Sequence, residues 1–175
     1  MRTHFALVTG ASSGIGLAFA KGLAARGYNM LIVSNEEAIH LRAKELRAEY
    51  PAIEVVSIVR DLSLQTAARE LYEYTKAQEI EVEVLVNNAG VYHDRDILDD
   101  SEAFTSLILN LHMYTPAMLC YLFGQDMRLR KHGYILNVCS VTSKIVAQRL
   151  GTYASTKSFL AAFTRSLHIE LKPYG

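Results

Sequence analysis

Short runs of valine, isoleucine and leucine alternate along this chain with longer segments whose apolar residues recur at three- and four-residue spacing. The short runs are typical of buried strands and the longer segments of helices, so the alternation predicts a parallel sheet. Every connection is long enough for a right-handed crossover, which places helices on both faces in a doubly wound α/β fold. The five expected strands are Phe5–Val8, Met30–Val33, Val55–Val59, Val84–Val86 and Tyr134–Val138. The expected helices are Gly16–Arg26, Glu36–Tyr50, Leu64–Gln78, Glu102–Arg130 and Tyr153–Leu171.

The composition fits one globular domain and argues against two kinds of partner. Half of the 175 residues are hydrophobic, and no linker or repeat divides residues 1–175, so we expect a single domain. Eighteen basic residues balance eighteen acidic ones, and nothing builds the positive field that nucleic acid or an anionic membrane surface requires. Cys120 and Cys139 lie inside apolar runs, where buried free thiols are usual, so we expect a cytoplasmic protein.

The segment Ala103–Gln125 has no acidic or basic residue and is long enough to cross a bilayer. Asn110 and His112 lie near its middle, where polar groups are costly in lipid, and charged residues follow it closely. We therefore expect no membrane span here, but an apolar helix covered by a sheet on one side and by a partner subunit on the other.

A glycine-rich loop joins the first expected strand to the first expected helix. Gly10 permits a tight turn, Gly14 lets the backbone approach a diphosphate, and Gly16 lets the helix pack closely on the strand. The free N–H groups at the helix start would bind the anion, although a plain strand–helix turn is the alternative interpretation. The residues expected to bind a dinucleotide here are Thr9, Gly10, Ser12, Ser13, Gly14, Ile15 and Gly16.

The loop "TGASSGIG" resembles the cofactor fingerprint of the short-chain dehydrogenases/reductases, and later motifs match that family in order across the chain. The resemblance implies a Rossmann-like fold and an NAD(P)-dependent oxidoreductase. By resemblance, Asp61 and Leu62 of "RDLS" would contact the adenine, and Asn88, Ala89 and Gly90 of "NNAG" would lie along the cofactor. Taken alone, the first motif is also typical of a helix cap and the second of a turn.

Tyr153 and Lys157, in "YASTK", lie four residues apart and so on one helix face. The ammonium of Lys157 would favour phenolate over phenol at Tyr153 and so make the phenol a usable proton carrier. Such a pair alone is often only surface decoration. By resemblance, Tyr153 would be the general acid/base, and Lys157 would also bind the nicotinamide ribose.

Two further residues complete the implied catalytic set. Ser140 lies thirteen residues before Tyr153, the separation usual in the family, and would hydrogen-bond the substrate oxygen; Ser143 is the alternative. Asn110 occupies the position of the asparagine that the family uses to hold a water beside the lysine, although a satisfied core amide is the other interpretation. Pro116 removes a helical N–H four residues after His112, which predicts a local distortion close to Asn110.

The implied reaction is reversible hydride transfer between a nicotinamide cofactor and a small-molecule carbonyl/alcohol pair. NAD-preferring relatives often carry an acidic residue where this chain has Ser34, and NADP-preferring ones an arginine where it has Asn35. The missing carboxylate favours NADP(H) over NAD(H). Glu36 and Glu37 stand a little further on and could reach a ribose hydroxyl, although their simplest role is favourable charge in the first turn of a helix.

Three expectations concern what surrounds this machinery. The family's sixth strand, substrate-covering segment and seventh strand do not follow Gly175. We therefore expect the fifth strand to be an apolar sheet edge. We also expect slow turnover or none, because the segment that excludes water from the substrate is missing. A catalytically silent dinucleotide-binding or oligomerising module is therefore the alternative function, and an interaction protein is a third. By resemblance, helices 102–130 and 153–171 would form a homodimer or homotetramer. Substrate-side candidates are Tyr92, His93 and 144–149, which are also typical of solvated loops.

Overall fold

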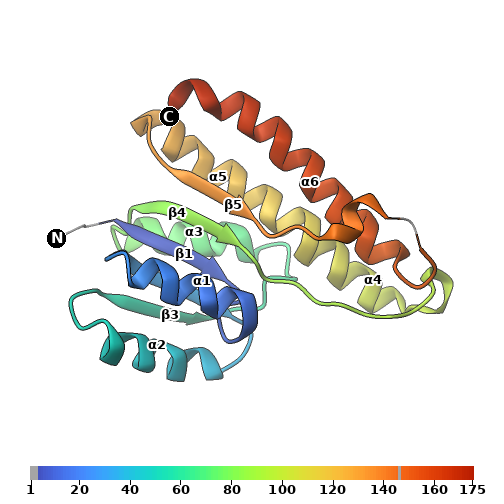
Figure 1. Cartoon of the computed structure of the whole chain (residues 1–175), viewed down its shortest axis with the longest axis horizontal. Coiled ribbons are helices and arrows are strands. Elements are labelled where there is room, and N and C mark those ends of the chain that lie inside the picture. The colour runs from blue at the N-terminus through green and yellow to red at the C-terminus, as the bar shows by residue number, and fades with distance from the viewer. Residues whose placement is uncertain (1–3, 146) are drawn as a thin grey trace.

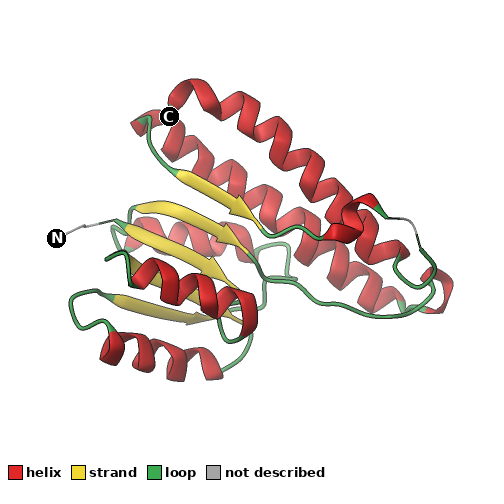
Figure 2. Ribbon diagram, viewed as in Figure 1, coloured by secondary structure: helices red, strands yellow, loops and turns green. Residues whose placement is uncertain are grey.

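The computed structural model describes residues 4–145 and 147–175, and these form a five-stranded parallel sheet in the order β3-β2-β1-β4-β5 (Figures 1 and 2). The prediction of an α/β fold with five parallel strands is confirmed, and the strand bounds differ from the expected ones by at most two residues. The strands are β1 Phe5–Thr9, β2 Asn29–Ser34, β3 Val55–Val59, β4 Val82–Asn87 and β5 Tyr134–Asn137. The helices are α1 Gly14–Ala24, α2 Ala38–Glu49, α3 Ala67–Ala77, α4 Glu102–Leu109, α5 Thr115–Arg130 and α6 Gly151–Leu171.

The side-chain alternation of the central strands builds a separate core on each face of the sheet. Phe5 and Leu7 of β1 pack in one cluster with residues of α3 and α5, whereas Ala6 and Val8 pack in the other with residues of α1 and α2. Figure 2 shows the helices lying on both sides of the sheet. Both faces of β1 are therefore buried, as expected for the middle strand of a doubly wound sheet.

Two helices begin later than expected because side chains turn the chain first. The hydroxyl of Ser34 accepts a hydrogen bond from the N–H of Glu36, and α2 begins only at Ala38. The carboxylate of Asp61 accepts hydrogen bonds from the N–H and the hydroxyl of Ser63, and α3 begins only at Ala67. The expectation that Glu36 and Glu37 lie in the first turn of a helix was wrong, since the first turn of α2 holds no acidic residue.

The long segment 102–130 is not one regular α-helix. A π-helical turn, Asn110–Tyr114, separates α4 from α5, and the N–H of Thr115 donates to the carbonyl of Asn110, five residues back. Pro116 follows directly and has no N–H to restore the α-helical pattern. The predicted distortion close to Asn110 is confirmed, and its form is a wider turn.

Among the described residues, one helical stretch, Glu102–Arg130, is long and apolar enough to cross a membrane by length and composition alone. Half of its most apolar window is buried inside the molecule. Its second half, α5, packs on α3, on the sheet and beside α6 (Figure 1). The apolar residues of this stretch therefore pack partly in the core of the molecule.

Candidate active site at the carboxyl edge of the sheet

A cleft of about 440 Å³ opens at the carboxyl ends of β1, β2, β3 and β4, the edge at which parallel sheets bind ligands. It brings together four stretches that lie far apart in the sequence. Of the residues predicted to bind a cofactor, those that line it are Gly10, Ser12, Ser13, Gly14, Ile15, Ser34, Asn35, Asp61, Leu62, Asn88, Ala89 and Gly90.

The glycine loop has the shape of a cradle for an anion. Gly10 and Gly14 have φ of +65° and +54°, a left-handed conformation that favours glycine. A Cβ at Gly14 would meet no atom within 4 Å, so the backbone there is open to a ligand. Ser13 makes no capping hydrogen bond with its side chain at the start of α1, and the first turn holds no acidic residue. The loop and helix start therefore fit a dinucleotide diphosphate, whose negative charge the helix N-terminus stabilises.

Two predicted residues lie behind this cradle. A Cβ on Gly16 would come within 2.1 Å of the carbonyl oxygen of Gly10, so only glycine lets α1 pack so closely on the loop. Thr9 is buried, and its hydroxyl oxygen accepts hydrogen bonds from the N–H groups of Asn88 (2.9 Å) and Ala89 (3.0 Å). The amide of Asn88 in turn donates to the carbonyls of Thr9 and Gly10. Thr9 and Gly16 thus hold the wall of the cleft and do not line it.

Arg60 is a cleft residue that the sequence interpretation missed. Ser34 pairs with Val59 in the β2–β3 ladder, so Arg60 leaves the sheet beside Ser34 and Asn35. Its guanidinium donates to Glu70 of α3 at 2.6 Å and carries the positive charge that neither Ser34 nor Asn35 supplies. The hydroxyl of Ser34 donates to the hydroxyl of Ser12 at 3.1 Å, which joins this end of the cleft to the glycine loop.

Lys157 connects the helix that carries Tyr153 to the strand before Ser140. Lys157 is 5% exposed, and its ammonium donates to the carbonyl of Val138 at 3.0 Å. The ammonium nitrogen lies 5.8 Å from the centroid of the Tyr153 ring, so the charge lies near the phenol ring, as expected. Burial lowers the pKa of Lys157 from its ordinary value, and only the negative charge of an ionised Cys139 would oppose this shift.

Ser140 follows β5, and its hydroxyl is hydrogen-bonded to Thr142. Its oxygen accepts hydrogen bonds from the N–H of Thr142 (3.2 Å) and from the hydroxyl of Thr142 (2.8 Å). A serine hydroxyl has two acceptor positions and one proton, so the proton of Ser140 remains available for donation to a substrate oxygen. The alternative, Ser143, is tied by its carbonyl to the hydroxyl of Ser158 on α6.

Asn110 opens the π-helical turn that packs against α6. Its backbone carbonyl is the acceptor for Thr115. His112, two residues on, is 1% exposed, and its ring meets that of Tyr153 edge to face with centroids 5.6 Å apart. The sequence interpretation assigned His112 no role at the site, although a histidine inside an uncharged apolar segment was the available signal.

The substrate-side candidates lie on two segments, one after β4 and one before α6, that contact each other. Tyr92 packs edge to face on Tyr153 with centroids 5.2 Å apart, and His93 pairs with Asp100 at 3.0 Å. Arg149 donates to the carbonyl of Asp94 at 3.1 Å, so the segment after β4 touches the segment before α6. Of the candidates at 144–149, residue 146 lies outside the described residues.

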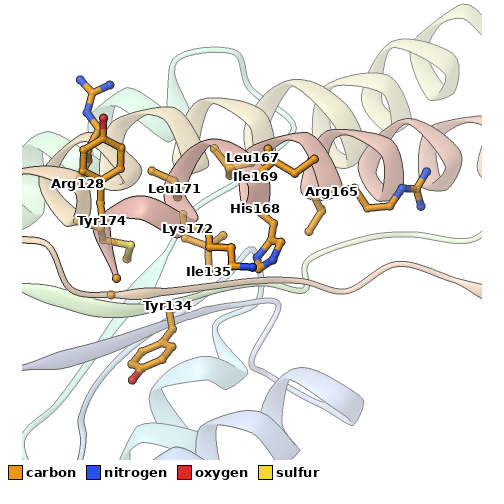
Figure 3. Close-up of a pocket in the computed structure, with 14 residues that line it drawn as sticks. Arg128, Tyr134, Ile135, Arg165, Leu167, His168, Ile169, Leu171, Lys172 and Tyr174 are labelled. Atoms are coloured by element: carbon orange, nitrogen blue, oxygen red, sulfur yellow. The ribbon is translucent and has the colours of Figure 1, made fainter.

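A larger groove, of about 740 Å³, lies on another part of the molecule, between β5 and α6 (Figure 3). Its lining is mostly apolar and includes Ile135, Leu167 and Leu171. β5 is one of the two edge strands, and its side chains Tyr134 and Leu136 are 57% and 40% exposed. The expectation of an apolar sheet edge at the fifth strand is therefore confirmed. The groove shares no residue with the cleft.

Comparison with known proteins agrees with this geometry. A family model described as short chain dehydrogenase matches residues 4–175. The very-long-chain 3-oxoacyl-CoA reductases of Aspergillus terreus and Danio rerio (reductase-A) are 32% and 31% identical; the match covers 98% of this chain in both and 49% and 54% of those proteins. The chain thus spans about half the length of the curated relatives it matches.

Solved structures give the same result for the fold. The bulky-bulky ketone specific alcohol dehydrogenase from Comamonas testosteroni superposes with a TM-score of 0.92 at 28% identity, covering 98% of this chain and 69% of that one. A metagenomic short-chain oxidoreductase in complex with NADP gives 0.92 at 27%, covering 99% and 79%. The chain belongs to the short-chain dehydrogenase family of oxidoreductases.

Proposed function

We propose that this chain carries the cofactor cleft and the catalytic residues of an oxidoreductase that reduces a carbonyl to an alcohol, or the reverse, with NADP(H). The observation that carries the proposal is that Lys157 lies beside Tyr153 on α6 and binds the carbonyl of Val138, two residues before Ser140. Family membership supports the reaction class. The nicotinamide ring, when bound, supplies or accepts the hydride.

The residues of the site have the following tasks in this proposal. Tyr153 gives its phenolic proton to the carbonyl oxygen as charge develops there, and Ser140 donates a hydrogen bond to the same oxygen. Lys157 holds a positive charge beside the phenol and fixes the turn of α6 against Val138. Asn110 supports proton supply from the side of the π-helical turn. The glycine loop and the start of α1 bind the diphosphate.

The preference for NADP(H) is supported by the end of the cleft at Ser34. No carboxylate stands at Ser34 or Asn35 to bind a ribose 2′-hydroxyl, and Arg60 places a guanidinium on the same wall. Guanidinium groups bind phosphate strongly through paired hydrogen bonds. Glu36 also lines the cleft and favours NAD(H), so the balance between Arg60 and Glu36 decides the preference.

Assembly and location are part of the same proposal. We propose a homodimer or homotetramer through the segment 102–130 and α6, supported by exposed apolar side chains on these helices. Tyr121, Leu129 and Ile169 are 58%, 80% and 71% exposed. A cytoplasmic location is supported by the two cysteines, which are free thiols, and by the balanced charge.

The test is a fluorescence titration of the chain with NADPH and NADH, followed by single-turnover oxidation of NADPH with acetoacetyl-CoA, a probe chosen from the names of the curated relatives. Saturable binding and a chemical step that Tyr153→Phe abolishes support the proposal. Binding without turnover by any probe carbonyl would favour the catalytically silent dinucleotide-binding module. Failure of a folded chain to bind either cofactor would overturn both.

A further inference from the structure

His112 lies buried where three parts of the site meet: the π-helical turn, the segment that follows β4, and helix α6. On one side its Nε2 accepts a hydrogen bond from the N–H of Val91 at 2.9 Å. On the other side its Nδ1 lies 3.0 Å from the hydroxyl of Thr156. The imidazole thus spans the gap between the wall of the cofactor cleft and the turn of α6 that begins at Tyr153.

The direction of every hydrogen bond in this connection follows from simple chemistry. A backbone N–H only donates, so Nε2 of His112 must carry a lone pair, and the neutral ring then holds its proton on Nδ1. Nδ1–H donates to the hydroxyl of Thr156, and that hydroxyl donates to the carbonyl of Tyr153 at 2.8 Å. The hydrogen bonds therefore run in one direction, from Val91 to the backbone of Tyr153, and the hydroxyl of Thr156 accepts one of them and donates the next.

The surroundings keep this imidazole neutral. Burial, and then the ammonium of Lys157, lower the pKa of His112 to about 3. The other group that faces the ring is Tyr153, packed edge to face on it. A protonated imidazole would put a second N–H where the N–H of Val91 already points, so charge and geometry favour the same state.

The cleft wall is shaped for the ring. A Cβ added at Gly90 would lie 2.9 Å from Nε2, so glycine at this position leaves the room that the imidazole occupies. Gly90 also lines the cofactor cleft. A displacement of His112 would therefore move the cleft wall and the Tyr153 turn relative to one another.

We propose that His112 is a positioning residue of the reaction centre, a neutral bridge that fixes Tyr153 relative to the cofactor cleft through Thr156 and Val91. It carries no proton in the reaction. The inference rests on the proposed function, because only that function gives the position of Tyr153 a chemical consequence.

The kinetic test replaces each half of the bridge. His112→Phe keeps a ring but removes both hydrogen bonds, and Thr156→Val removes the hydroxyl at similar volume. We expect each to slow single-turnover oxidation of NADPH by acetoacetyl-CoA by about 10- to 100-fold with little change in the affinity for NADPH. The double variant should be no slower than the worse single one, because both break one bridge. His112→Asn, whose amide can still donate to Thr156, should recover part of the rate. His168→Phe, at an exposed position on α6, is the matched control.

A purely structural histidine would give a different result. In that case His112→Phe would lower the melting temperature but leave the rate per folded molecule unchanged, and the two single effects would add. Either of these outcomes overturns the proposal.

A second readout needs no turnover. In a chain labelled with ¹⁵N-histidine, NMR should show His112 as the Nδ1–H tautomer, without titration between about pH 5 and pH 8. In a chain labelled with ¹³C-tyrosine, His112→Phe should shift the ring signals of Tyr153 but not those of exposed Tyr134. A titrating His112, an Nε2–H tautomer or unmoved Tyr153 signals would overturn the bridge. If the wild-type chain neither binds NADPH nor reacts, the proposed function fails, and these signals still decide the bridge.

Discussion

The ammonium of Lys157 donates a 3.0 Å hydrogen bond to the carbonyl of Val138, two residues before Ser140. This bond ties α6 to the end of β5, so the helix that carries Tyr153 and the loop that carries Ser140 share one buried contact. The lysine therefore acts at once as a charge beside the phenol and as a structural tie.

Replacing Lys157 by methionine should remove both effects. We expect single-turnover oxidation of NADPH to slow by about 100-fold or more, because proton transfer by a positioned group contributes on that order. Burial lowers the pKa of Lys157, which means that the folded state disfavours its charge, but Lys157→Met also leaves the carbonyl of Val138 without this donor, so we expect a loss of about 1 to 3 kcal/mol in the free energy of unfolding. Stopped-flow absorbance gives the rate and thermal unfolding gives the stability. Lys172→Met, at an exposed position beyond α6, is the control, and an unchanged rate in Lys157→Met would contradict the assigned role.

Arg60→Met tests the cofactor preference. Loss of a guanidinium that binds the 2′-phosphate should weaken NADPH by about tenfold and leave NADH nearly unchanged. Glu70→Gln, which removes the carboxylate paired with Arg60, should keep NADPH binding or strengthen it. Arg69→Met changes the same charge on the exposed side of α3 and should alter neither affinity. Fluorescence titration of the wild type and the three variants measures these affinities. An equal loss of affinity for both cofactors in Arg60→Met would mean that Arg60 stabilises the fold and does not bind the 2′-phosphate.

Gly16→Ala tests the packing beneath the glycine loop. The added Cβ would meet the carbonyl oxygen of Gly10 at 2.1 Å, and backbone there cannot move without opening the cleft. We expect a loss of at least about 2 kcal/mol in the free energy of unfolding, together with loss of NADPH binding. Gly22→Ala lies in the same helix, where the Cβ makes only an ordinary 3.5 Å contact, and should stabilise the chain by about 0.5 to 1 kcal/mol. Urea unfolding of Gly16→Ala and Gly22→Ala separates the cost of the steric clash with Gly10 from the effect of helix propensity.

The strand–helix order and the glycine loop could be predicted because both depend on local pattern. Five strands and the positions of Gly10 and Gly14 follow from apolar periodicity and from the loop between the first strand and helix. The late start of α3 could not be predicted in this way, because the side chain of Asp61 accepts a hydrogen bond from the N–H of Ser63 and so forms a turn in place of the helix.

Arg60 and His112 were missed for a different reason. Arg60 reaches the cleft only through the register that pairs Ser34 with Val59, and His112 has a role only once Val91 and Thr156 lie on either side of it. The spacing of residues within a single motif does not predict contacts between segments that lie far apart in the sequence. The helix with Tyr153 and Lys157 could be proposed as part of the site from its sequence, whereas its contacts with Val138 and the π-helical turn became visible only in the structure.

Two substitutions test which surface would mediate the proposed self-association. Tyr121→Glu places a charge on the exposed apolar side of α5, and Leu136→Lys places one on the open edge strand β5. If the helices form the homodimer, Tyr121→Glu should give monomers in analytical ultracentrifugation while Leu136→Lys keeps the wild-type mass. The reverse pattern would assign association to the sheet edge and contradict the helix interface.

The pH dependence of stability should carry the signature of His112. Its pKa in the folded state is about 3, below the ordinary value of 6.5, because the site is buried and faces Lys157. The unfolded chain therefore takes up a proton near pH 6.5 that the folded chain refuses until about pH 3, and stability falls as the pH drops through that window. At pH ~4 this one group should cost about 3 kcal/mol relative to neutral pH.

Other groups also titrate in that window, so the prediction concerns a difference between two chains. His112→Phe lacks the titrating ring, and its loss of stability from neutral pH to pH ~4, measured by urea unfolding at each pH, should be smaller than that of the wild type by about 3 kcal/mol. His168→Phe, at an exposed position, should leave the wild-type difference unchanged. Equal losses in all three chains would mean that His112 takes up its proton in the folded state, and the neutral bridge between Val91 and Thr156 would then be wrong.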